Sequence, residues 1–279
     1  MAKVAFAGLS THRRFAGERW STDGMIAVKD DIAEETPVAL VYNGLPFVVM
    51  MASPLDLTDF ALGFSLSEGI VESSSEILEI NIAKHPEGIE INLAIAAERF
   101  AELEKKQRNL TGRTGCGLCG AQNLAQAIRH PQTVPSQVVI SHAIVERAVQ
   151  SLDEFQPLNV ATGSVHAAAW VDFEGVIQLA REDVGRHNAL DKLIGAMFSH
   201  GAPLNEGWLL LTSRASYEMV QKAATVGIEI VAAISAPTAL AIRLARETGV
   251  TLIAFARDSR HTIYANPERL TQHAEALVA

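Results

Sequence analysis

The chain changes its pattern of apolar and polar positions near its middle. In the first part, over residues 25–110, short apolar runs flank two groups of turn residues, Asn43-Gly44 and Pro86–Gly88. Paired apolar runs about such turns are typical of β-hairpins. Residues 1–24 show no regular period and are predicted to form a tail. The pattern therefore predicts a tail followed by a small domain built on hairpins.

Two helices complete the small domain and make it α+β. The first is predicted over 53–69, with Ser53 as its cap, Pro54 in its first turn and Gly69 at its end. Its apolar residues recur at helical spacing: Leu57, Phe60, Ala61 and Phe64. The second is a charged helix over residues 96–110.

The second part of the chain alternates apolar strands with helices. Strands are predicted at 208–213, 228–235 and 250–256, and helices lie between and after them. Strands that are apolar almost throughout are typical of a parallel sheet with helices on both faces. The fold class is therefore α/β. The predicted domains are the tail at 1–24, the α+β domain at 25–110, a glycine-rich loop with a short helix at 111–136, and an α/β domain at 137–279.

Composition and charge narrow the possible functions. Of 279 residues, 48% are hydrophobic and 20% are charged, as is usual for a globular protein, and the formal net charge is −9. Nucleic-acid binders are usually basic, so no nucleic-acid partner is expected. No segment reaches the roughly 18–20 apolar residues of a membrane span, and we find no secretory signal. We therefore expect a cytoplasmic protein that has no membrane partner.

Both cysteines of the chain, Cys116 and Cys119, lie in the stretch TGRTGCGLCG at residues 111–120. Its glycines disfavour a regular element, because each glycine inside one costs about 0.5–1 kcal/mol. We therefore expect a mobile, exposed loop. Arg113 and the positive end of the helix predicted from Ala121 both favour a thiolate. In a reducing compartment such a pair is more often catalytic or metal-binding than structural.

Three alternatives for the cysteine pair stay open. One is a zinc site completed by His166 and His187, although structural zinc usually takes four ligands and no second CxxC exists. Another is a thioredoxin-like oxidoreductase, although that fold carries its CxxC near the start, at a strand–helix junction. The last is a pair of thiols without a function. We assign no metal ligands.

Polar residues also gather where strands of the α/β domain are predicted to end. Ligands of open α/β sheets bind beyond the carboxyl ends of the strands, and hydroxyls, helix N-termini and arginines together suit phosphate. Two groups of such residues stand out: the first contains Glu182, Asp183, Arg186 and His187, and the second contains Ser213, Arg214, Ser235, Thr238, Arg257 and Arg260. For both groups the alternative is an ordinary solvated loop, and His166 is equally well explained as a core residue.

Five segments resemble, in order, the motifs of the FdhD family, the formate dehydrogenase accessory sulfurtransferases: GRTGCGLCG, TGSVHAAAW, EDVGRHNALDKLIG, LTSRASYEMVQKAA and SAPTALAI. The resemblance runs from about Glu35 to Leu270. It implies a homodimer whose C-terminal α/β/α domain has the cytidine deaminase fold. Deaminase activity is not implied, because His166 is followed by alanines where an H-x-E segment needs glutamate, and no P-C-x-x-C comes later.

The resemblance also implies a function and a site. Such a protein accepts persulfide sulfur from a cysteine desulfurase and transfers it to the bis-molybdopterin guanine dinucleotide cofactor, which carries molybdenum or tungsten, before the cofactor enters apo-formate dehydrogenase. Cys116 carries the persulfide by this analogy. The helix dipole would instead favour the Cys119 thiolate, so Cys119 receives a supporting role. The family's cofactor-binding segment maps onto Phe255, Ala256, Arg257, Asp258, Ser259 and Arg260.

The guanine dinucleotide carries phosphates, which the strand-end residues Ser213, Arg214, Ser235 and Thr238 could hold. GDP is therefore expected to bind as a fragment of the cofactor, and no zinc is expected. Two other functions remain as alternatives. One is a chaperone that binds the molybdenum cofactor without sulfur chemistry, and the other is a thiol–disulfide redox protein.

Overall fold

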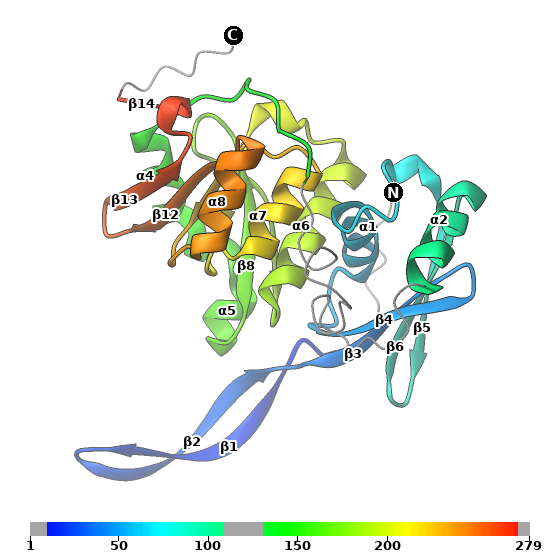
Figure 1. Cartoon of the computed structure of the whole chain (residues 1–279). Coiled ribbons are helices and arrows are strands. Elements are labelled where there is room, and N and C mark those ends of the chain that lie inside the picture. Colours follow the sequence, from blue (N-terminus) through cyan, green and yellow to red (C-terminus); the bar gives the residue numbers. More distant parts are fainter. Residues whose placement is uncertain (1–9, 109–130, 273–279) are drawn as a thin grey trace.

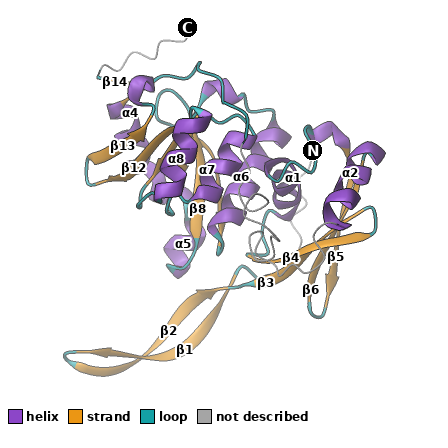
Figure 2. Cartoon of the chain, viewed as in Figure 1, coloured by secondary structure: helices purple, strands orange, loops and turns teal. Residues whose placement is uncertain are grey.

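The computed structural model describes residues 10–108 and 131–272 of the chain. Figure 1 shows a large α/β body, a smaller sheet with its helices beside it, and a long two-stranded ribbon that projects away from both. Figure 2 shows the same arrangement by secondary structure. Within the described ranges, no helix is long and apolar enough to cross a membrane.

Both predicted hairpins are present in the smaller sheet. Its strand order is β4-β3-β6-β5. Asn43 (φ 47°) and Gly44 (φ 82°) form the first turn, and Asn and Gly are the residues that tolerate this left-handed backbone best. The elements are β3 (Thr36–Tyr42), β4 (Leu45–Ala52), β5 (Ile77–His85) and β6 (Gly88–Ile95), with α1 (Leu57–Ser67) and α2 (Ala97–Arg108).

The predicted cap of the first helix is wrong. Helix α1 begins at Leu57 and its N-cap is Asp56. Ser53 is instead buried against the larger body: its N–H donates to Asp183 Oδ2 over 2.9 Å, and its hydroxyl accepts from the N–H of Val184 over 3.1 Å. A tertiary contact has therefore replaced the local capping bond.

The larger body is built on a six-stranded sheet with the order β13-β12-β11-β10-β8-β9. The predicted parallel strands are confirmed, because β11 lies between β10 and β12 and is parallel to both. The outer neighbours are antiparallel. The strands are β8 (His166–Val171), β9 (Ile177–Asp183), β10 (Trp208–Leu211), β11 (Ile230–Ala233), β12 (Thr251–Arg257) and β13 (Arg260–Ala265).

Helices cover both faces of this sheet, as the apolar strands predict. Along β10, Leu209 and Leu211 join the core on one face, and Trp208 and Leu210 join the core on the other. The first face is covered by α6 (Arg186–His200), α7 (Tyr217–Thr225) and α8 (Ala239–Thr248), and the second by α4 (His142–Ser151). The mixed α/β class is confirmed, while the likeness to cytidine deaminase and the domain boundaries stay predictions.

Three short elements lie at the margins of the larger body. Helix α5 (Pro157–Thr162) precedes β8, and its first N–H groups donate to the buried carboxylate of Glu182. Strand β7 (Ile140–Ser141) pairs in parallel with β14 (Leu270–Thr271). This pairing fastens the end of the described chain to the start of α4.

Helices α1 and α6 join the two sheets through an unusually close approach. A Cβ atom at Gly63 would lie 1.7 Å from the carbonyl oxygen of Asp191, and one at Gly195 would lie 1.9 Å from that of Asp59. Only glycine permits backbones to come so near. One apolar core consequently continues from β3 and β6 through α1 and α6 to the larger sheet.

The N-terminal prediction is wrong for the residues that the structure describes. Residues 12–21 were expected in an irregular tail, yet they form β1 (His12–Ser21), which pairs along its whole length with β2 (Gly24–Ala33). Most side chains of this ribbon are exposed on both faces. An exposed ribbon needs no one-sided apolar pattern, so the sequence held no periodic signal for it.

Candidate functional site

The carboxyl ends of the parallel strands bring several predicted residues together. The N–H of Thr238 donates to the carbonyl of Ala215 over 3.0 Å, and the N–H of Phe255 donates to that of Ser235 over 3.1 Å. The loops after β10 and β11 therefore lie side by side, next to Phe255 of β12. This confirms that Ser213, Arg214, Ser235, Thr238 and Phe255 share one edge of the sheet.

The polar side chains at this edge differ in what they can offer a ligand. Ser213 is buried and its hydroxyl donates to the carbonyl of Arg214 over 3.1 Å. Thr238 caps α8, because its hydroxyl oxygen accepts from the N–H of Ala241 over 3.3 Å. The Arg214 side chain is exposed. Arg214 therefore supplies the positive charge at this edge, whereas the hydroxyls of Ser213 and Thr238 form hydrogen bonds with nearby backbone groups.

The first predicted cluster reaches the same edge. Strand β8 is antiparallel to both β9 and β10, so β9 ends where β10 ends. Helix α6 follows directly and begins with Arg186 and His187. His166, the first residue of β8, lies opposite Asp183, the last of β9. Two clusters that the sequence separates by about 30 residues thus form one basic edge, which we define as His166, Arg186, His187 and Arg214.

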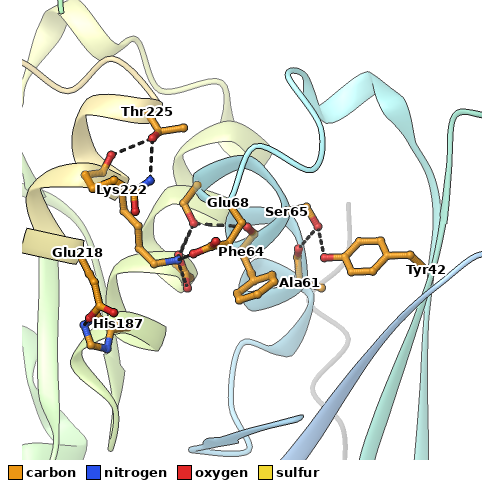
Figure 3. A network of polar contacts seen from close by, with 12 residues as sticks. Tyr42, Ala61, Phe64, Ser65, Glu68, His187, Glu218, Lys222 and Thr225 are labelled. Carbon is orange, nitrogen blue, oxygen red and sulfur yellow. Dashed lines mark hydrogen bonds and ion pairs between the residues drawn. The ribbon is translucent and has the colours of Figure 1, made fainter. Parts of the chain in front are cut away.

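The side chains of the basic edge influence one another electrically. Burial lowers the pKa of His166, and the positive charges of Arg186, His187 and Arg214 lower it further, against the opposing effect of Asp183. The Nε2 atom of His187 lies 2.5 Å from Glu218 Oε2 of α7 (Figure 3). The hydrogen bond from His187 lowers the pKa of Glu218, although burial opposes it. This ion pair joins the start of α6 to α7 at the basic edge.

Two features make the basic edge suitable for an anion. Helices α6 and α7 both begin there, and helix N-termini carry unpaired N–H groups and partial positive charge. Arg186 Nε and Ser216 Oγ are buried polar atoms without a hydrogen-bond partner within the described part of the chain. Buried polar groups are rarely left unpaired, so a phosphate or similar anion would satisfy them.

Glu182 and Asp183 are not part of the basic edge. Both were predicted in the turn after a strand, but they are the last residues of β9 and are buried. Asp183 Oδ2 lies 2.6 Å from Lys192 Nζ, and both side chains are fully enclosed. Burial raises the pKa of Glu182, although the N–H groups at the start of α5 oppose the shift. These carboxylates therefore hold neighbouring elements together.

The segment Phe255–Arg260 departs from its predicted place after a strand. Strand β12 continues to Arg257, which pairs with Arg260 in the first position of β13. Asp258 (φ 53°) and Ser259 (φ 55°) form the turn between them. Asp and Ser are frequent turn residues because their side chains can bond to the nearby backbone. Arg260 thus lies on a returning antiparallel strand, at the tip of a hairpin.

This hairpin borders a cavity of about 410 Å³ that lies between it and α4. Such a volume lies within the range usual for small-molecule sites. Residues Ala256, Arg257, Asp258, Ser259 and Arg260 line one wall, and His142, Glu146 and Gln150 line the other. Ser213, Arg214, Ser235 and Thr238 are not among the lining residues. The structure therefore divides the predicted pocket into the basic edge and this hairpin cavity, with Phe255 between them.

The cavity contains a histidine pair that the sequence analysis missed. His142 Nδ1, at the start of α4, lies 2.8 Å from His261 Nε2 of β13. Such a contact requires one imidazole nitrogen to donate and the other to accept. Burial lowers the pKa of His261, and the His142 charge acts in the same direction. The two histidines are 119 residues apart, so only the fold could reveal their contact.

A buried polar network surrounds Lys222, one turn of α7 after Glu218 (Figure 3). Lys222 of α7 donates to both carboxylate oxygens of Asp191 over 2.9 and 3.0 Å, and to Ser67 and Glu68 of the α1 end over 2.9 Å. Burial lowers the pKa of Lys222, but the charges of Asp191 and Glu68 outweigh burial and raise it. The lysine is therefore a charged tie between α1, α6 and α7.

The predicted sulfur chemistry falls outside these observations. Cys116 and Cys119 lie outside the described residues, so their roles and the zinc alternative stay predictions. Within residues 10–108 and 131–272, no group of three His, Cys, Asp or Glu side chains is placed to hold a metal ion.

Comparisons with known proteins agree on one family. The model of the FdhD/NarQ family matches residues 33–271. Sulfur carrier protein FdhD of Cupriavidus necator is 50% identical over 267 residues, which cover 96% of this chain and 92% of that protein. Sulfur carrier protein FdhD of Xanthomonas euvesicatoria is 50% identical over 260 residues, covering 93% and 91%.

A solved structure of similar fold also matches this chain. It is that of a protein from Desulfotalea psychrophila, provisionally described as a formate dehydrogenase accessory protein. It aligns with a TM-score of 0.72 at 26% identity over 94% of this chain and 100% of that one. On the family match and the extent of identity, this chain belongs to the FdhD/NarQ family.

Proposed function

We propose that this protein is a sulfur carrier for formate dehydrogenase. It accepts persulfide sulfur from a cysteine desulfurase and transfers it to the bis-molybdopterin guanine dinucleotide cofactor before that cofactor enters the apo-enzyme. Membership of the FdhD/NarQ family, with half of the aligned residues identical to proteins named sulfur carriers, is the observation that carries the proposal.

The first chemical step would use Cys116. Its thiolate attacks the terminal sulfur of the desulfurase persulfide; a new S–S bond forms on Cys116, and the desulfurase cysteine leaves as a thiolate. The terminal sulfur then remains on Cys116 as a persulfide, which is the form that would be delivered to the cofactor. Cys119 has a supporting role in this scheme.

Mass spectrometry tests the sulfur-carrier step. After incubation with a cysteine desulfurase and cysteine, we expect Cys116 to gain about 32 Da, the mass of one sulfur atom in a persulfide. The Cys116→Ala protein should lack this adduct and should not activate formate dehydrogenase. Full activation by that variant would refute sulfur transfer and favour a chaperone that only binds the cofactor. A reversible Cys116–Cys119 disulfide that exchanges with protein disulfides would favour the redox alternative.

The guanine dinucleotide of the cofactor suits the two parts of the site. Its phosphates need cations and hydrogen-bond donors, which the basic edge offers through Arg214 and the starts of α6 and α7. The hairpin cavity offers Arg257 and Arg260 beside a space of about 410 Å³. Phe255 lies between the two and could contact the base.

Calorimetry with GDP tests this placement. A charge-assisted contact contributes roughly 1.5–3 kcal/mol, so Arg214→Ala and Arg260→Ala should each weaken GDP binding about tenfold or more. Arg147→Ala is the matched control, because Arg147 lies on α4 but donates to the carbonyl of Glu174, in the turn after β8. Both site variants should still form the persulfide. Unchanged GDP affinity in both would mean that the nucleotide binds elsewhere.

A further inference from the structure

The His142–His261 pair has no role in the function proposed above, although both histidines line the hairpin cavity. Their rings are nearly parallel, with centroids 4.9 Å apart and planes inclined by 20°. His142 begins α4, and His261 follows Arg260 in β13, so the pair bridges the two walls of the cavity. Both side chains are only partly buried and are therefore open to a ligand.

The contact between the two rings limits the positive charge that the pair can carry. His142 Nδ1 and His261 Nε2 lie 2.8 Å apart, so one nitrogen donates and the other accepts. The accepting ring is necessarily neutral, and the closed pair holds at most one positive charge. Burial lowers the pKa of His261 and a charge on His142 lowers it further, whereas Glu146 opposes both effects. While the contact persists, His261 is therefore mostly neutral at pH 7.

The other charges in the cavity wall cancel. Apart from the histidines, the described residues that line the cavity include two arginines, two carboxylates and no further ionisable side chain: Arg257, Arg260, Glu146 and Asp258. With neutral histidines, the wall thus has two positive and two negative groups and no net charge. Among these side-chain types, only histidine ordinarily changes its charge between pH 5 and 8. The protonation of the pair therefore decides whether the cavity attracts an anion.

Charges on the neighbouring helices do not change this balance. His261 contacts α4 and so points to the face of the sheet opposite α8, whose apolar side belongs to the other core. The charged residues of α8 consequently lie across the sheet from the pair: Arg243, Arg246 and Glu247. On α4, Arg147 donates to the carbonyl of Glu174, and neither residue lines the cavity.

We propose that the His142–His261 pair is a proton-dependent contact for the diphosphate of the guanine dinucleotide, an inference that rests on the proposed binding of this cofactor in the hairpin cavity. The diphosphate enters beside Arg257 and Arg260, and the two rings separate. Each facing nitrogen then donates to a phosphate oxygen, and the pair takes up one proton from solvent to supply the second N–H. The negative charge of the ligand favours this protonated form. Release of the ligand returns the proton and restores the contact.

Calorimetry with diguanosine diphosphate tests the proton uptake. Its diphosphate is a diester, so the charge of this probe stays constant between pH 5.5 and 7.5, unlike that of GDP. One unit of pKa shift corresponds to a tenfold change in affinity, so the probe should bind about tenfold more tightly at pH 5.5 than at pH 7.5. Titrations at pH 6.5 in buffers of different ionisation enthalpy should show an uptake of about half a proton or more per bound probe.

Two variants assign this dependence to the pair. His142→Gln and His261→Gln should each bind the probe at pH 7.5 much as the unmodified protein does, but their affinity should change little with pH. The reason is that glutamine can donate a hydrogen bond but cannot gain a charge. His85→Gln is the matched control, because His85 is an exposed histidine on β5 of the smaller sheet. The control should keep the full pH dependence.

Three results would overturn the proposal. The first is an affinity that does not change with pH, or binding without proton uptake, in the unmodified protein; this measurement does not depend on the folding of any variant. The second is a pH dependence that both variants keep, which would assign the protons to the histidines of the basic edge. The third is an absence of binding at either pH, which would also refute the placement of the cofactor. The sulfur-carrier step fails or stands separately, because persulfide formation on Cys116 is measured without the probe.

Discussion

The α1–α6–α7 junction and the β1–β2 ribbon use the same ion-pair chemistry with different consequences. At the junction, Lys222 and Asp191 are 2.9 Å apart, and their side chains are only 6% and 1% exposed. On the ribbon, Arg14 and Asp31 are 2.8 Å apart, but their side chains are 65% and 25% exposed. Water competes with the second pair and not with the first. Burial, rather than distance, therefore decides which pair the fold depends on.

The largest expected effect comes from removing one partner at the junction. Lys222→Ala leaves the Asp191 carboxylate buried without its cation, and breaking such a pair costs about 3–5 kcal/mol of the free energy of unfolding. Urea denaturation measures the loss. The double variant Lys222→Met with Asp191→Leu should recover much of it, because the fully buried carboxylate is removed together with its cation. Equal losses in the single and double variants would contradict this explanation.

An intermediate effect is expected from pH. Burial lowers the pKa of His261 and of His166 in the folded protein. Below the ordinary value of about 6.5, the unfolded chain therefore binds protons that the folded protein does not, and stability falls as the pH decreases. The fall ends once the pH is below the folded pKa values, where both states are protonated. A lower Tm at pH 5 than at pH 7.5 would support this.

A variant can assign part of that pH dependence to the histidine pair. His261→Gln removes one titrating group from the contact with His142 but keeps a side chain that can form hydrogen bonds. The Tm of this variant should depend less on pH than that of the unmodified protein. An identical dependence would assign the effect to other groups.

The smallest effect is expected on the ribbon. Arg14→Ala removes a cation whose hydrogen bond lowers the pKa of Asp31, but both side chains meet water. We expect no measurable change in the midpoint of urea unfolding, with or without added salt. A salt-sensitive loss of stability would show that this pair matters as much as the buried one.

The sequence predicted elements whose signals are local. The turn at Asn43-Gly44 and the apolar strands β10, β11 and β12 follow from nearby residues. The parallel order of these three strands is enough to place Ser213, Ser235 and Phe255 at one edge of the sheet. The prediction failed where distant contacts override local preference. Ser53 bonds to Asp183 and Val184 rather than capping α1, and Arg260 turns back into β13.

What the sequence determined by itself is the chemistry: a single cysteine pair, a supply of arginines in the α/β domain, and motifs specific enough to indicate the family that the comparisons confirmed. Only the tertiary structure decided how these groups combine. It joined two separate clusters into the basic edge, formed the His142–His261 contact and extended the ribbon away from the body. The physical reason is range, because turns and apolar periods act over a few residues, whereas these features depend on packing between segments up to 119 residues apart.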